Sequence, residues 1–308
     1  MKKILICLIF IFSVFLIHST VGYETEPKGS KEEKKFQKST EVGENIFEHK
    51  SYEKIITLFK EWEAKSENFI EVKTYGKTSG NLDQYYIRIS NETSPGEKVV
   101  LLTASTHGNE PLSTSVMIAY IGSMLNFYGK NKEITEILNS TTIYFVPVVS
   151  PDSYPDKRNV DNVDPNRNFP TLKNPQKESV VPIKNLQKLF LEIKPNSVLS
   201  GHTYGRLFLI PWGDSVIDNP NYLEYKSIVD RMSEISKYGN KKASQLYGKP
   251  IFGTEIDWYH RNGAFAIVVE FGTHQRKPSL ADTKEEFNRT FDSFIYFLEE
   301  STKVLIYN

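Results

Sequence analysis

Cysteine is almost absent from this sequence of 308 residues. The one cysteine, Cys7, lies within an apolar stretch at the N-terminus. We expect this stretch to be cleaved off as a signal peptide, as argued below from its composition. The mature chain then has no cysteine, so it can form no disulfide and can use neither a thiol nucleophile nor a zinc–thiolate site. Any metal site in the mature chain must therefore be built from His, Asp and Glu. Cys7 also lacks the position of a lipid-modified cysteine, so we predict no lipid anchor.

The sequence also has no excess of positive or negative charge. Lys plus Arg and Asp plus Glu number 38 each, which gives a formal net charge of zero. No global field therefore directs the chain toward a polyanion, and we predict no nucleic-acid partner. Long hydrophobic runs are missing beyond the N-terminus, so we expect no stable membrane span after that segment is removed.

The N-terminal residues have the composition of a secretory signal peptide, which we place at 1–22. Lys2 and Lys3 precede an apolar run from Ile4 to Ile17. This run is shorter than the roughly 20 residues of a membrane-spanning helix, so we favour cleavage over a retained anchor. We therefore expect a secreted or periplasmic protein. Residues 23–45 are mostly polar and offer little to bury, which predicts a flexible leader.

The remaining residues, 46–308, alternate between apolar runs and amphipathic stretches without a long linker, which predicts one α/β domain. The apolar content of 39% is enough for one large core. We expect strands at 70–75, 85–89, 99–104, 142–149, 198–200, 207–210 and 265–271. We expect helices at 52–66, 111–127, 183–193, 222–237 and 285–305.

Polar side chains follow three of these apolar strands. His107 and Glu110 follow the strand expected at 99–104, and His202 follows the strand at 198–200. Glu270 lies near the end of the strand at 265–271. Open α/β sheets place ligand sites at such strand ends. Two histidines and one glutamate form a known zinc ligand set that leaves a position for water. We therefore predict one zinc ion bound by His107, Glu110 and His202, although a His-x-x-Glu pair alone is common in solvated loops.

The order of these residues resembles that of the zinc carboxypeptidases related to carboxypeptidase A. The resemblance runs from about Tyr52 to the C-terminus. Its blocks are His107-x-x-Glu110, Val146–Asp152, Asp164–Pro170, His202–Gly213, Ile256–Trp258 and Val269–Phe271. It implies a single domain with a central mixed twisted β-sheet flanked by helices on both faces. It also implies cleavage of an amide bond in a peptide or small amide substrate with a free carboxylate.

The resemblance implies a role for several polar residues between the metal ligands. Arg167 would bind the substrate carboxylate through its planar guanidinium, a geometry that the lysine ammonium cannot reproduce. Asn166 would add a neutral hydrogen-bond donor. Arg158 would stabilise the oxyanion. Asp164 would orient a zinc-bound imidazole, that of His107.

Two further residues complete the implied site. Glu270 would take a proton from the attacking water and deliver it to the departing amine. Tyr204, which follows His202 directly in the matching segment, would contact the substrate.

The match is incomplete in places that affect the substrate. The family's Asn-Pro-Asp-Gly is replaced by Ser150–Ser153. Lys249 stands where a mobile, substrate-covering tyrosine is expected, and Tyr247 is the nearest replacement. Ile256 occupies the position that, in the family, recognises the terminal side chain of the substrate. An apolar residue there predicts a preference for apolar or aromatic terminal side chains. Neighbouring Glu255 would instead attract a basic side chain.

Two other functions stay open at this point. The turn His107–Glu110 reads His-Gly-Asn-Glu, as in N-acyl amino acid deacylases of the aspartoacylase and succinylglutamate desuccinylase type, which share the metal site. A non-catalytic peptide-binding module would have lost a ligand or the base, and here all are in place. We favour a secreted zinc exopeptidase, with the peptide stems of bacterial cell walls among its candidate substrates.

Overall fold

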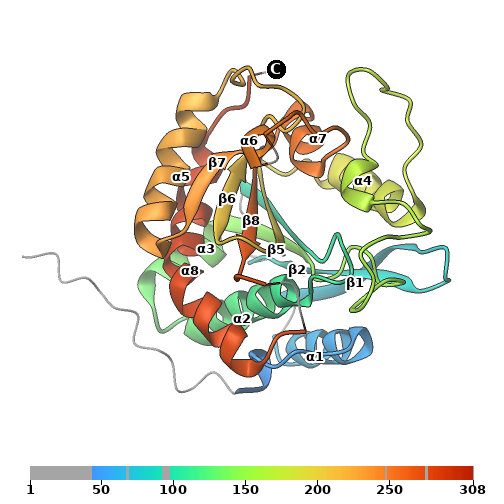
Figure 1. Cartoon of the computed structure of the whole chain (residues 1–308). Coiled ribbons are helices and arrows are strands. Elements are labelled where there is room, and N and C mark those ends of the chain that lie inside the picture. The colour runs from blue at the N-terminus through green and yellow to red at the C-terminus, as the bar shows by residue number, and fades with distance from the viewer. Residues whose placement is uncertain (1–43, 67–68, 92–97, 247, 275–276, 308) are drawn as a thin grey trace, which may run out of the picture. The chain divides into compact units, whose positions relative to one another are not determined.

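The computed structural model describes residues 44–66, 69–91, 98–246, 248–274 and 277–307 (Figure 1). All of them belong to one compact unit, Lys38–Asn308. The predicted signal peptide, nearly all of the predicted leader and Tyr247 lie outside the described residues. Within these ranges, every helix is too short or too polar to cross a membrane.

In the described part of the chain, eight strands form one mixed sheet in the order β1-β2-β4-β3-β5-β8-β6-β7. Strands β4, β3, β5 and β8 are parallel, whereas β2 is antiparallel to β1 and β4, and β6 to β8. The mixed sheet predicted above is therefore confirmed. The strands are β1 (Ile70–Lys77), β2 (Asp83–Ile89), β3 (Lys98–Ala104), β4 (Thr141–Val146), β5 (Ser197–Thr203), β6 (Leu207–Ile210), β7 (Gly239–Lys242) and β8 (Phe265–Phe271).

Helices cover both faces of this sheet. In Figure 1, α1, α2 and α8 lie on one side, and α4 and α7 lie on the other. The helices are α1 (Tyr52–Ala64), α2 (Pro111–Phe127), α3 (Lys132–Ser140), α4 (Val181–Ile193), α5 (Tyr222–Ser236), α6 (Ala243–Leu246), α7 (Glu255–Arg261) and α8 (Leu280–Glu300). Short 3-10 helices occupy Glu44–Ile46, Pro165–Arg167 and Ser301–Lys303.

The central strands explain where polar groups gather. β3 and β8 consist mostly of apolar residues, whereas β5 combines Val198 and Leu199 with small and polar residues; all three strands are largely buried, as expected of parallel strands covered by helices. Because they are parallel neighbours, their carboxyl ends meet at one edge of the sheet. The residues that end these strands or follow them are therefore brought together.

Two strands end three residues away from the predicted position. The strand expected at 142–149 ends at Val146, since Pro147 has no N–H to donate to a ladder. β5 continues past Ser200 to Thr203, because its polar end still pairs with β8. This extension places His202 within the strand.

Helix boundaries differ as well. α8 begins at Leu280 instead of residue 285, because Ser279 and Asp282 form a capping box ahead of the expected start. The short helices α3, α6 and α7 and the strand β7 were not predicted. Asn131 caps α3, accepting the N–H of Ile134 at 3.0 Å.

A buried histidine in α7 connects this helix with α5 and β8. The hydroxyl of Tyr225 lies within hydrogen-bonding distance of Nδ1 of His260, at 3.0 Å, and accepts the N–H of Ala266 at 2.8 Å. Burial, with a smaller contribution from the positive charge of Arg261, lowers the pKa of His260 to about 4. His260 is therefore neutral in the folded chain at physiological pH.

We expect His260 to make the protein less stable as the pH falls from 6.5 to 4. The unfolded chain binds a proton at the ordinary pKa of 6.5, whereas the folded chain binds it only near pH 4. This difference corresponds to about 3 kcal/mol of the free energy of unfolding. Urea denaturation at pH 7 and pH 4.5 should show a smaller acid loss in His260→Asn than in wild type. Equal losses in both proteins would contradict the assignment.

Candidate metal centre

The turn between β3 and α2 positions the first two predicted ligands. A Cβ on Gly108 would lie 2.4 Å from the carbonyl carbon of Ser153, so only glycine fits this close approach. Pro111 opens α2 at a position where a missing N–H costs nothing. The N–H of Glu110 donates to the carbonyl of His107 at 3.2 Å. The turn thus presents the His107 and Glu110 side chains together.

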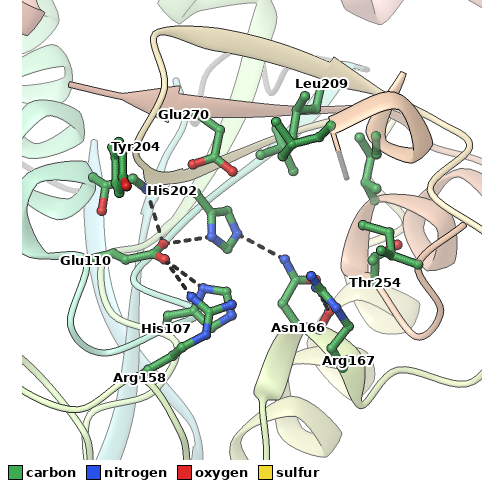
Figure 2. Close-up of a pocket in the computed structure, with 16 residues that line it drawn as sticks. His107, Glu110, Arg158, Asn166, Arg167, His202, Tyr204, Leu209, Thr254 and Glu270 are labelled. Carbon is green, nitrogen blue, oxygen red and sulfur yellow. Dashed lines mark hydrogen bonds and ion pairs between the residues drawn. The ribbon is translucent and has the colours of Figure 1, made fainter. Parts of the chain in front are cut away.

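Glu110 lies between two imidazoles. Its Oε1 is 2.8 Å from Nδ1 of His107, and its Oε2 is 2.8 Å from Nδ1 of His202. The N–H of Thr203 also donates to Oε2 at 3.2 Å. All three residues are buried, and one donor atom from each lies within 4.8 Å of the other two. The structure therefore brings the three predicted ligands together at one point (Figure 2).

The outer nitrogens of both imidazoles face carboxylates. Nε2 of His107 is 2.9 Å from Oδ1 of Asp164, and Nε2 of His202 contacts Oε1 of Glu255. Both contacts leave Nδ1 directed toward the space shared with Glu110. Metal-binding histidines adopt this arrangement, and two imidazoles with one carboxylate form a donor set that zinc accepts. The residues present fit a zinc ion.

The electrostatics of the site support the same fit. Burial lowers the pKa of His202, but Glu110 and Glu255 outweigh it and raise that pKa well above 6.5. The pKa of His107 is raised in the same way, against burial, by Glu110 and Asp164. Conversely, the imidazoles lower the pKa of Glu110 to about 2 although burial opposes this. A divalent ion would replace two imidazolium protons without changing the total charge.

Glu270 lies beside this centre. It is the register partner of His202 across the parallel strands β5 and β8. Its carboxylate points into the same cavity (Figure 2). Burial, assisted by the charge of Glu110 and opposed by that of His202, raises the pKa of Glu270 to about 7. The structure thus places the predicted base next to the predicted ligands.

The predicted carboxylate-binding residues come from the 3-10 turn at Pro165–Arg167. Oδ1 of Asp164 accepts the N–H of Asn166 at 3.0 Å, and the side-chain oxygen of Asn166 accepts the N–H of Glu255 at 2.9 Å. Arg167 donates to the carbonyl of Asn166 at 2.7 Å. Arg158 donates to Asp164 at 3.0 Å and to Glu110 at 3.4 Å. All three polar side chains, Arg158, Asn166 and Arg167, line the cavity.

The cavity has a volume of about 330 Å³. Besides the polar groups above and Tyr204, it is lined by an apolar wall of Leu209, Ala243, Leu246, Ile251, Ile256 and Val268. In Figure 2, Leu209 lies across the cavity from His107. Only Ile256 was predicted from the sequence. The other wall residues belong to separate segments whose apolar patterns look like ordinary core.

The position of Glu255 does not support the expectation that it attracts a basic side chain of the substrate. It is fully buried, and it is not among the described residues that line the cavity. Its carboxylate contacts His202 and accepts the hydroxyl of Thr106 at 3.0 Å. Both oxygens are therefore engaged with the protein. No signal in the sequence connects the start of α7 with the end of β5.

The fold and the three converging donors define a class of α/β proteins with a buried His-Glu-His metal centre at the ends of parallel strands. The chain belongs to the zinc carboxypeptidase family, whose sequence model matches residues 55–287. This membership favours a carboxypeptidase over the deacylase alternative.

Individual relatives agree with the family. Carboxypeptidase D of Mus musculus is 24% identical over 235 residues, which cover 70% of this chain but 17% of the relative. Carboxypeptidase A4 of Mus musculus is 24% identical over 269 residues, covering 73% of this chain and 63% of the relative. This chain thus spans less than two thirds of either relative.

A solved structure gives independent support for the fold. The crystal structure of thrombin activatable fibrinolysis inhibitor is similar with a TM-score of 0.77 and 15% sequence identity. The similarity covers 87% of this chain and 78% of the other. At this level of identity, the comparison supports the fold alone.

Proposed function

We propose that this chain is a zinc-dependent metallocarboxypeptidase that hydrolyses the C-terminal peptide bond of substrates with a free carboxylate. The observation that carries the proposal is the convergence of His107, Glu110 and His202 beside Glu270 in one cavity. Membership of the zinc carboxypeptidase family supports the same activity.

The three ligands would hold one zinc ion, through Nδ1 of each histidine and a carboxylate oxygen of Glu110. Bound zinc would supply a Lewis acid that acidifies water and polarises the scissile carbonyl. Asp164 would keep the His107 ring turned so that Nδ1 faces the ion.

Glu270 would accept the proton of the attacking water and deliver it to the departing amine. Its strand register supports this role, because β8 holds the carboxylate next to His202. Arg158, which already contacts Glu110, would stabilise the negative charge that develops on the carbonyl oxygen.

Arg167 and Asn166 would bind the terminal carboxylate of the substrate. Their place on the cavity wall supports this role, and the planar guanidinium suits a carboxylate. Tyr204, whose side chain is largely exposed at the cavity, would contact the substrate from the solvent side.

The apolar wall supports a preference for substrates with an apolar or aromatic terminal side chain. Six aliphatic side chains, including that of Ile256, would surround it. The burial of Glu255 removes the reason to expect a basic preference.

We also infer that the mature enzyme acts outside the cytoplasm as a secreted or periplasmic protein. The charged and apolar pattern of residues 1–22 supports export. Peptide stems of bacterial cell walls stay candidate substrates on this basis.

Removing zinc with a chelator should abolish the hydrolysis of N-blocked dipeptides, and adding zinc should restore it. We expect one zinc ion per chain by elemental analysis, because the site offers one set of three converging donors. Chromatography of the released amino acid measures the rate. Full activity in protein whose metal content has fallen to zero would refute the proposal.

Glu270→Gln should keep its zinc but lose turnover by about 10²- to 10⁴-fold, because an amide cannot accept the proton. Steady-state kinetics should show the loss mainly in kcat. Glu224→Gln, an exposed glutamate on α5, is the matched control and should behave like wild type. Normal turnover in Glu270→Gln would overturn the assignment of the base.

Dipeptides ending in Phe or Leu should be cleaved with kcat/KM about 10-fold or more above those ending in Lys or Asp. Replacing Ile256 with Ala should raise KM for the apolar substrates about 10-fold, because pocket methylenes contribute about 1–3 kcal/mol. A basic preference in the wild-type enzyme would rule out the apolar wall as the specificity pocket.

A further inference from the structure

Glu255 is a buried carboxylate for which the catalytic scheme above has no use. It is the first residue of α7, and its side chain is inaccessible to solvent. Burying a carboxylate is costly unless charged or polar groups surround it. Its partners should therefore indicate what it does.

The two oxygens of Glu255 have two different partners. Oε1 contacts Nε2 of His202, and Oε2 accepts the hydroxyl of Thr106 at 3.0 Å. Thr106 precedes the predicted ligand His107 in the turn after β3. The Glu255 carboxylate therefore connects the end of β5 with the turn that carries the other two ligands.

The backbone of Glu255 is held as well. Its N–H donates to the side-chain oxygen of Asn166 at 2.9 Å. The residues on either side, Thr254 and Ile256, line the cavity, whereas Glu255 does not. The start of α7 thus directs one side chain toward the metal centre and its neighbours toward the substrate pocket.

We propose that Glu255 is a positioning residue for zinc binding, which fixes the ring of His202 so that Nδ1 points at the metal. The inference rests on the zinc site of the proposed function. Glu255 would do for His202 what Asp164 does for His107, so that each imidazole ligand has its own carboxylate on the far nitrogen.

A role in recognising the substrate does not fit these contacts. A carboxylate that attracts a basic side chain must reach the cavity with an oxygen available, and both oxygens of Glu255 are engaged inside the protein. A purely structural anchor for α7 would need Thr106 and Asn166, but it would not need an imidazole.

The test is the zinc affinity of Glu255→Gln, measured by competition with a chelating dye in the absence of substrate. The neutral amide keeps the shape of the side chain but removes the charge that supports the imidazole as a ligand. We expect zinc affinity to fall about 10- to 100-fold. The visible spectrum of the cobalt-substituted protein should also change, because the ring orientation is less well fixed.

Asp257→Asn is the matched control. This carboxylate is also buried in α7, two residues further on, but it accepts the N–H groups of Gly213 and Asp214 and contacts no ligand. We expect wild-type zinc affinity in this variant. The thermal midpoints of the zinc-free proteins should be compared, so that a general loss of folding is separated from a loss of metal binding.

Glu255→Asp gives a second, independent test. It keeps the negative charge but withdraws it from Nε2 of His202, so we expect a loss of affinity similar to that of Glu255→Gln. Wild-type affinity in either variant would overturn the proposal, because contact and charge are both required. If wild-type protein binds zinc tightly and Glu255→Gln binds it equally well, only this inference fails. If wild-type protein binds no zinc, the proposed function fails with it.

Discussion

The carboxylate of Glu110 between two imidazoles is the interaction on which the rest of the site depends. One imidazole belongs to the same tight turn, and the other belongs to β5, so the contact requires β3 and β5 to end at the same level. The parallel order of the central strands provides this alignment, and β8 adds Glu270 in register with His202. The sheet therefore sets the distances between the three predicted metal ligands and Glu270.

A site of this kind concentrates charge in a region that excludes water. Isolated buried charges are costly, and here the Glu110 carboxylate faces two imidazoles and a backbone N–H. Asp164 and Glu255 share this property although they come from a loop and from a helix. A dication bound by Glu110 and both Nδ1 atoms would take the place of two imidazolium protons, while Asp164 and Glu255 would stay on the Nε2 atoms.

The cavity combines this polar centre with an apolar wall, and each half suits one part of a peptide end. The arginines and Asn166 suit a carboxylate and a developing oxyanion, whereas the aliphatic residues suit a terminal side chain. α7 contributes to both halves, since Ile256 faces the cavity and Glu255 faces His202. One short helix thus contributes a residue to the cavity wall and a residue beside the candidate metal centre.

The order of residues along the chain sets the kinds of group available and much of the local structure. The absence of cysteine after residue 7 left His, Asp and Glu as metal donors, apolar runs marked the central strands, and Pro111 marked the start of α2. These features are local, so they can be read along the chain. The partner of Glu255, which is 53 residues from His202, and the composition of the apolar wall depend instead on tertiary packing. Such contacts depend on how distant segments pack, and no pattern of neighbouring residues encodes them.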